Sequence, residues 1–548
     1  MRLRYCLVAL LLTTAATAQQ PRQLPIDTYI HQSWDHLQRS MTDCASFPDV
    51  KAPATNSQPN PVTAPILYLP EEQKLTHELR SLEQHCNVHI QHLPHRIRTL
   101  GDLDPADIPT PGLLYLPNPY VVPGGRFNEM YGWDSYFILL GELADNRVAL
   151  ARGTVENFFY EIDHYGAVLN ANRTYYLTRS QPPFLSSMVL AVYNAELPTN
   201  PKDARKFLQE SLPYLLRDHN LWITTPHLDL TTGLSRYFDL GDGPVPEMSD
   251  DSTYYTTVLH GLLAHPSAAN ATYLQPPPAC IATTCPQPHA DGQVLTPSFY
   301  QGDRAMRESG FDTSFRFGPY SGSTQDFAPV DLNALLYKYE RDIAFINATL
   351  GNPRDAIIWS TTAGDRLNTI NTLMWDETSG LYDDFNLRTH QRSTYRYLTT
   401  YYALWAGVAS RTKAARMVSS LPLFDHPGGL AMSTFTSGEQ WDAPYGWAPT
   451  NWLTITGLIR YGYIGDALTI ARHFSSTIAT NYANDGTLRE KYNVVDSSAN
   501  VAISAGYKEN VIGFGWTNGV YTAMQQLLHD PKLLHDPQQP LPPNDPLH

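Results

Sequence analysis

Apolar residues recur every three or four positions along two long stretches of the chain, the spacing of an amphipathic α-helix. In the first stretch Asp331 can cap a helix, whose apolar positions are Leu332, Leu335, Leu336, Tyr339, Ile343 and Ile346. In the second, Asp466 precedes Ala467, Ile470, Ala471, Phe474 and Ile478. Residues 398–421 and 453–463 are predicted helices as well. No strand–helix–strand alternation and no glycine-rich phosphate loop is visible.

The helices predicted between residues 124 and 529 come in pairs, separated by polar loops that contain Gly and Trp. Such pairs fit a closed ring of helix hairpins, in which the loops at one end surround a pocket. Residues 19–529 are therefore expected to form a single domain, with residues 19–117 as an N-terminal region that wraps around the ring. Residues 266–297 are expected to form a surface loop. The Pro- and Asp-rich residues 530–548 lack a core-forming pattern and are expected to be disordered.

The N-terminus has the features of a secretory signal peptide. Arg2 and Arg4 precede a short apolar run at residues 6–12, and Ala16 and Ala18 provide small residues for cleavage before Gln19. An anchor helix is the alternative, but the run is too short to cross a bilayer. We therefore expect residues 1–18 to be a signal peptide and the protein to be exported, to the periplasm or outside the cell, with no membrane span after cleavage.

The amino-acid composition limits the kinds of molecule that the protein is expected to bind. The chain has 548 residues, 42% of them hydrophobic and only 17% charged, with 33 Tyr, 10 Trp and a net charge of −15. An acidic protein repels phosphate backbones, so nucleic acid is excluded as an expected partner. Abundant aromatic residues suit a protein that faces carbohydrate.

Four cysteines remain after signal removal: Cys44, Cys86, Cys280 and Cys285. In an exported chain they allow three pairings, and Cys280–Cys285 with Cys44–Cys86 is one of them. Zinc is the alternative, because His85 and His89 lie beside Cys86. We favour disulfides, or free thiols, over a metal site.

Candidate chemistry is concentrated in five stretches that mix charged residues with aromatic ones, a combination that purely structural segments rarely show. Charged side chains can grip sugar hydroxyls while aromatic faces stack on sugar rings. The stretches are PGGRFNEMYGWDSYF (123–137), NANRTYYLTRSQPP (170–183), ESGFDTSFRF (308–317), EQWDAPYGWAPTNW (439–452), and LREKYN (488–493) with GFGWTNG (513–519).

These stretches resemble the trehalases of glycoside hydrolase family 37, in order, from about residue 110 to 525. The resemblance implies an all-α fold, an (α/α)6 barrel, and hydrolysis of the disaccharide α,α-trehalose to two glucoses with inversion, without cofactor or metal. Inversion needs a protonated carboxyl and an ionised carboxylate roughly 6.5–9.5 Å apart. The resemblance assigns Asp312 as the general acid and Glu490 as the general base.

Local chemistry agrees with both assignments. Apolar neighbours such as Phe311 favour a protonated Asp312, and the positive neighbours Arg489 and Lys491 favour an ionised Glu490. The resemblance further implies sugar-binding roles for Arg126, Trp133, Asp134, Asn170, Arg179, Ser180, Gln181, Glu247 and Gly310.

Two positions depart from the family pattern. Val245 replaces the arginine of an Arg-Pro-Glu motif, and Ile512 stands where an acidic residue precedes GFGW; Glu509 is a nearby substitute. A related small α-glucoside is therefore an alternative substrate. A trehalose-binding protein without activity is a second alternative, although binding alone would not need both carboxylates. A monomer is favoured.

Other prominent residues have structural interpretations. We expect Glu129 and Asp442 to be ion-pair or supporting partners, Arg316 to pair with a barrel carboxylate, Asp239 to form a turn, and Trp452 and Trp516 to pack in the core. Asn172, Asn270 and Asn347 begin Asn-x-Thr triplets, which occur often by chance.

Overall fold

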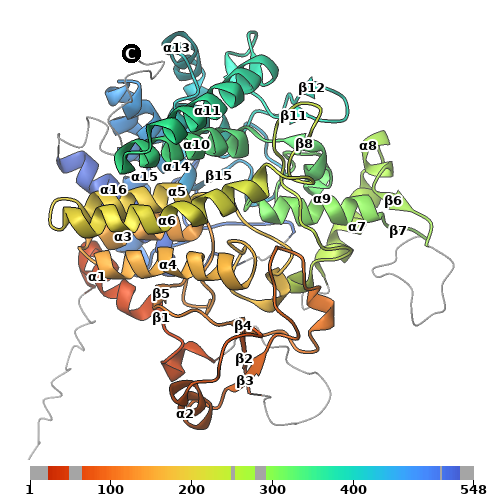
Figure 1. Cartoon of the computed structure of the whole chain (residues 1–548). Coiled ribbons are helices and arrows are strands. Elements are labelled where there is room, and N and C mark those ends of the chain that lie inside the picture. Colours follow the sequence, from red (N-terminus) through yellow and green to blue (C-terminus); the bar gives the residue numbers. More distant parts are fainter. Residues whose placement is uncertain (1–22, 49–63, 249–252, 278–291, 506–508, 531–548) are drawn as a thin grey trace, which may run out of the picture.

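A closed double ring of helices dominates the computed structural model, which describes residues 23–48, 64–248, 253–277, 292–505 and 509–530 (Figure 1). In the described residues each inner helix packs against the next, and the last packs against the first. The inner helices are α3 (Asp134–Ala144), α5 (Leu185–Glu196), α10 (Val330–Leu350), α12 (Tyr402–Ala406), α14 (Ala448–Arg460) and α16 (Gly515–His529). The predicted (α/α)6 barrel is confirmed.

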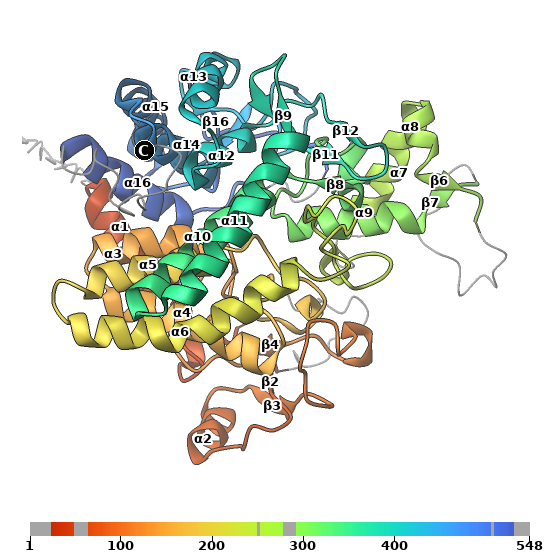
Figure 2. The same ribbon diagram turned by 45° about the horizontal axis from the view of Figure 1, so that its top comes forward.

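The outer helices cover this ring from outside, as Figure 2 shows for α4, α6 and α11. They are α1 (Ile26–Leu37), α4 (Val148–His164), α6 (Pro201–Trp222), α11 (Pro353–Leu373), α13 (Arg411–Ser419) and α15 (Ile464–Asp485). The two layers differ in burial: α10 is buried on nearly all sides, whereas its outer partner α11 buries only Ala363, Arg366 and Ile370. This contrast explains why an amphipathic stripe alone identified only some of the helices.

Two of the predicted helix details are wrong. The helix at residues 398–421 is interrupted, because α12 ends at Gly407 with a φ of 83° and α13 starts only at Arg411. Asp331 does not cap α10, which begins after Pro329; its carboxylate instead lies 2.6 Å from Arg316. The predicted helices at 453–463 and after Asp466 correspond to α14 and α15.

A side unit beside the ring leads to the 308–317 stretch. It comprises α7 (Tyr254–Ala264), α8 (Ala268–Ala271), β6 (Leu274–Gln275), β7 (Val294–Leu295) and α9 (Pro297–Glu308) (Figure 1). A small core of its own, with Val245, Tyr254 and Phe299, holds α9 in place. The described part of the predicted loop at 266–297 thus contains α8, β6 and β7, and Cys280 and Cys285 lie outside the described residues.

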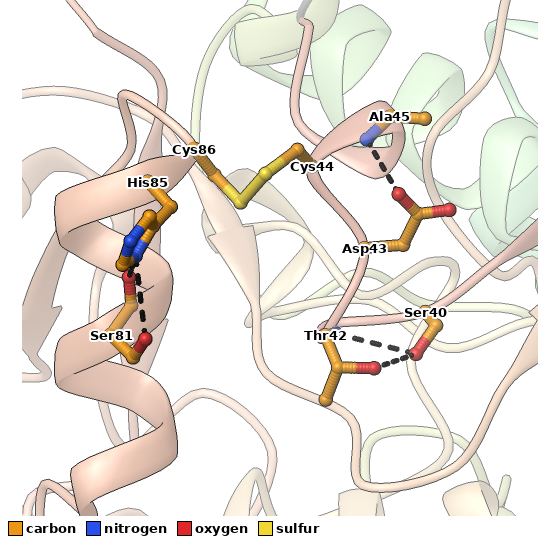
Figure 3. Close-up of a disulfide and its surroundings, with 8 residues drawn as sticks. All are labelled: Ser40, Thr42, Asp43, Cys44, Ala45, Ser81, His85 and Cys86. Atoms are coloured by element: carbon orange, nitrogen blue, oxygen red, sulfur yellow. Dashed lines mark hydrogen bonds between the residues drawn. A yellow bond between two sulfur atoms is a disulfide. The ribbon is translucent and has the colours of Figure 1, made fainter.

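A small parallel sheet forms in the N-terminal region and contradicts the expectation that strands and helices do not alternate. Strand β2 (Ile66–Leu69) pairs in parallel with β3 (His89–His92) and β4 (Leu113–Leu114), and α2 (His77–His85) connects β2 to β3. His89 thus lies on a strand. The disulfide Cys44–Cys86 joins the end of α2 to the 3₁₀ helix Cys44–Ser46 (Figure 3).

The remaining strands are two or three residues long and pair antiparallel across loops. They are β1 (Gln38–Arg39) with β5 (Tyr120–Val121), β8 (Phe327–Ala328) with β11 (Phe385–Asn386), β11 with β12 (Gln391–Arg392), β9 (Trp375–Asp376) with β10 (Leu381–Tyr382), β13 (Asp425–His426) with β14 (Gly429–Leu430), and β15 (Tyr445–Trp447) with β16 (Lys491–Asn493).

Candidate active site

An aromatic cluster brings four of the five stretches together. The indole ring of Trp133 lies 5.5 Å from the ring of Phe311, 5.9 Å from Trp441 and 5.6 Å from Trp516, measured between centroids. Trp441 in turn stacks on Trp447 at 3.7 Å. Because Phe311 precedes Asp312 and Trp133 precedes Asp134, this cluster fixes the backbone from which both carboxylates project.

Glu490 is held on one side of this cluster. It directly precedes β16, whose Lys491 lies opposite Trp447 of β15. The side chain is 3% exposed, and the Lys491 ammonium donates to Glu490 Oε2 at 2.6 Å. The indole N–H of Trp516 donates to the Glu490 carbonyl at 3.2 Å. The predicted base is thus an oriented carboxylate within an ion pair.

Asp312 follows α9 and is 31% exposed, with Arg307 Nη1 at 3.7 Å from its Oδ2. Desolvation by the surrounding protein raises the pKa of Asp312 to about 6, while the charges of Arg307 and Arg179 oppose the rise and Glu247 adds to it. A carboxyl with a pKa near 6 holds its proton far longer than an ordinary aspartate, as a general acid requires.

A third carboxyl, that of Asp134 at the start of α3, connects these two. Burial raises its pKa well above the ordinary value, and the charges of Glu490 and Asp312 raise it further. Asp312 and Glu490 therefore both lie within electrostatic reach of Asp134.

The 170–183 stretch contributes an arginine that several acceptors hold in place. Nη2 of Arg179 donates to Asn170 Oδ1 at 3.2 Å and to the carboxylate of Glu247, while Nη1 lies 3.5 Å from Asp239. The charges of Arg179 and Glu247 both act on Asp312. The predicted residues Asn170, Arg179 and Glu247 therefore lie on the acid side of the pocket.

The remaining predicted binding residues occupy different places. Gln181 Oε1 accepts a hydrogen bond from the backbone N–H of Trp133 at 2.9 Å, and Gly310 lies beside the Trp133 ring, where an added Cβ would be 2.9 Å from the indole. Ser180 donates its hydroxyl to Val168, so it supports the stretch from behind. Arg126 is 37% exposed and pairs with Glu509 at 3.5 Å, at the edge of the site.

Arg307 is a site residue that the sequence analysis missed. Its guanidinium reaches Asp312, lies 4.9 Å from the Tyr254 ring and pairs with Asp303 at 3.2 Å. Val245, where the family pattern has arginine, is fully buried in the same small core as Tyr254. Arg307 thus supplies a guanidinium on that side of the pocket. An arginine directly before the ESG motif was the available signal.

The second departure from the family pattern is Ile512. Ile512 is 46% exposed and bridges to Arg489 through the backbone. Glu509, the suggested substitute, is the partner of Arg126. It therefore lies on the rim of the pocket.

Several charged residues of the stretches support the frame. Glu129 pairs with Arg173 at 2.8 Å with both side chains buried. Arg316 binds the carboxylates of Asp384 and Asp331, as expected from the prediction that it pairs with a barrel carboxylate. Asp239, expected only to form a turn, accepts from Gly241 but also binds Arg304 at 3.0 Å.

Metal binding and glycosylation find little support. In the parts of the chain that the structure describes, no group of three or more His, Cys, Asp or Glu could hold a metal ion. Asn172, Asn270 and Asn347 are all buried, so their side chains are inaccessible in the folded protein.

Comparison with known proteins gives a consistent result. The profile of the family described as Trehalase matches residues 26–529. A probable trehalase of Eremothecium gossypii is 34% identical over 90% of this chain and 71% of its own length. The chain belongs to the trehalase family. Within this family of glycoside hydrolases, the cytosolic neutral trehalase of Saccharomyces cerevisiae is 36% identical over 82% of this chain.

A solved structure supports the same placement. Neutral trehalase Nth1 from Saccharomyces cerevisiae superposes with a TM-score of 0.75 at 31% identity, covering 93% of this chain and 95% of that chain. The chain spans only 64% of the full Saccharomyces cytosolic trehalase and 59% of the cytosolic neutral trehalase of Pyricularia oryzae, to which it is 38% identical.

The prediction of an exported protein is wrong on this comparison. Trehalase relatives at 36–38% identity are named cytosolic, and an apolar run behind two arginines describes composition without fixing cleavage or export. Residues 1–18 lie outside the described residues, so the signal peptide gains no structural support. Among the described helices none combines the length and apolarity needed to cross a membrane.

Proposed function

We propose that this chain hydrolyses α,α-trehalose to two glucose molecules with inversion, Asp312 acting as general acid and Glu490 as general base. The observation that carries the proposal is the contrast between the electrostatic surroundings of the two carboxyls. Burial favours the proton on Asp312, whereas Glu490 is ion-paired with Lys491. Asp134 interacts with both charges.

The reaction then follows from the positions of the groups. Asp312 gives its proton to the glycosidic oxygen as the bond to the anomeric carbon breaks. Glu490 takes a proton from a water that attacks the opposite face of the sugar, which inverts the anomeric configuration. The product from the attacked ring is β-glucose, and the released ring is α-glucose.

We assign substrate binding to the residues around this pair. Trp133 offers an aromatic face, Arg179 and Arg307 offer guanidinium donors on the acid side, and Asp134 accepts from hydroxyls. Asn170, Gln181, Glu247 and Gly310 complete the acid side, while Arg126 and Ser180 act at the rim and from behind. Residues 19–529 act as one catalytic unit in this proposal.

A second candidate is an inverting hydrolase of another small α-glucoside. Val245 and Ile512 favour it, since each removes a charged partner that the family pattern provides. Arg307 weakens this alternative because it restores a guanidinium beside the pocket.

Proton NMR of trehalose turnover tests the proposal. Equal early signals of α- and β-glucose are expected from the wild type, and loss of general acid or base catalysis should lower kcat by about 10²–10⁴ in Asp312→Asn and in Glu490→Gln. Asp163→Asn on the outer helix α4 is the matched carboxylate control and should turn over normally. Only α-glucose at early times would contradict inversion, and an active Asp312→Asn or Glu490→Gln would refute that residue's role.

A further inference from the structure

A buried carboxylate outside the reacting pair contacts the turn that bears the acid. Glu439 is 1% exposed and accepts a hydrogen bond from the hydroxyl of Thr313, the residue after Asp312. Its neighbour Gln440 donates to the Asp312 carbonyl, and Trp441 N–H donates to the Thr313 carbonyl at 3.1 Å. The segment 439–441 therefore fixes the backbone at Asp312 and at the residue after it.

Two residues close to this segment in the sequence, Gly438 and Tyr445, bind residues 502–505. Ser504 N–H donates to the Gly438 carbonyl at 3.0 Å, and Ala502 N–H donates to the Tyr445 hydroxyl at 2.9 Å. The backbone N–H of Ala505 stabilises the ionised form of Glu439. Contact is so close at Gly438 that an added Cβ would lie 2.4 Å from Ser504 Oγ. The loop that bears Glu439 is thus packed directly against residues 502–505.

Residues 510 and 511, a few positions further along, contact the base. The Val511 carbonyl accepts from Glu490 N–H at 3.0 Å, and the Asn510 amide donates to the Lys491 carbonyl at 3.0 Å. Residues 510 and 511 therefore support the base, whereas residues 439–441 support the turn that bears the acid.

We propose that Glu439 is a positioning residue that holds the turn of the acid Asp312 in place by accepting a hydrogen bond from Thr313. This role rests on the proposed hydrolysis. An ionised carboxylate can accept at both oxygens, whereas an amide of the same size can accept at only one. Glu439→Gln therefore removes the charge and one acceptor oxygen without changing the volume of the side chain.

The surroundings of Glu439 make this link sensitive to pH. Burial and the charge of Asp442 on the same segment raise the pKa of Glu439 to about 7, against the hydrogen bonds from Thr313 and Ala505. Tyr320, on the facing 3₁₀ helix Pro319–Ser321, also interacts with it. Below pH 7 a protonated Glu439 loses an acceptor, so the acidic limb of the wild-type kcat profile should flatten in Glu439→Gln.

Turnover of two substrates distinguishes a misplaced acid from a general loss of activity. Trehalose needs a proton on its leaving oxygen, whereas the fluoride of α-D-glucosyl fluoride departs without one, so that substrate needs only the base. Since a misplacement of about 1 Å can cost about 10²-fold, Glu439→Gln should lower kcat for trehalose by at least about tenfold. Turnover of the fluoride should stay within about threefold of wild type, because the base remains in place.

The ratio of the two rates does not depend on how much of the variant is folded. Thr313→Val removes the other end of the link and should lower the same ratio, whereas Glu142→Gln, a buried carboxyl at the far end of α3, should not. Equal losses with both substrates, or unchanged trehalose turnover in Glu439→Gln and Thr313→Val, would overturn the proposal. A wild type that releases no glucose from trehalose would overturn the proposed hydrolysis, and with it the positioning role of Glu439.

Discussion

Gly310 is the residue whose replacement tests the architecture of the site most directly. Its φ is +75°, and a Cβ built on it would lie 2.9 Å from the Trp133 indole, closer than Cβ contacts in real proteins. Gly310→Ala should cost about 1–2 kcal/mol for the left-handed backbone and about 1–3 kcal/mol more for the overpacked contact. The acid is two residues further along, so the strain acts on Asp312.

Gly462→Ala provides the matched control, because this glycine has a φ of +83° and nothing within 4 Å of its built Cβ. The control should lose only the backbone contribution of about 1–2 kcal/mol and keep its kcat/KM for trehalose. In Gly310→Ala the kcat/KM should fall by about 10²-fold if Asp312 or Trp133 moves by about 1 Å. Thermal melting and steady-state kinetics measure both effects. Equal melting temperatures and equal kcat/KM in the two variants would refute the reasoning.

Two further predictions concern a charge and a crosslink. Arg307 lowers the pKa of Asp312, so Arg307→Met should raise that pKa above about 6. Because activity is lost as the pH rises through the pKa of the acid, the alkaline limb of the kcat/KM profile should move to higher pH, and kcat/KM itself should fall by about 10–100-fold for a lost charged hydrogen bond. A limb that stays in place or moves to lower pH would contradict the assignment. Cys44 and Cys86 close a loop with a sequence separation of 42, so Cys44→Ser with Cys86→Ser should destabilise the N-terminal region by at most about 4 kcal/mol without changing kcat. Dithiothreitol should lower the melting temperature of the wild type only, and an equal effect on the double variant would rule out this contribution.

The sequence was most informative where a pattern repeats or is long. Amphipathic spacing predicted α15 and most of α10, and the mixed motifs predicted which distant stretches meet. Trp133, Phe311 and Trp516 do meet, because the centre of the ring can bury several large aromatic side chains together.

The rest depends on contacts that no local pattern encodes. Strand β2 has four apolar residues, too few to distinguish a strand from part of a helix, and its partner β3 is mostly exposed and polar. The break at Gly407 does follow a local signal, because Gly is the usual residue in the left-handed position after a helix, but the amphipathic spacing does not report it. Arg307 was missed because its role is visible only once α9 brings it to Asp312.

Ring closure also determines when the protein can first work. Helix α3 packs on α16, and Asn518 donates to Ser33 Oγ across a sequence separation of 485. At synthesis rates of about 5–20 residues per second, the roughly 380 residues between α3 and α16 take about 20–80 s to make. During this interval the face of α3 that packs on α16 has no final partner, and Trp133 lacks its contact with Trp516. Activity should therefore arise only after α16 has left the ribosome, and its onset would report the completion of folding rather than the arrival of any single motif.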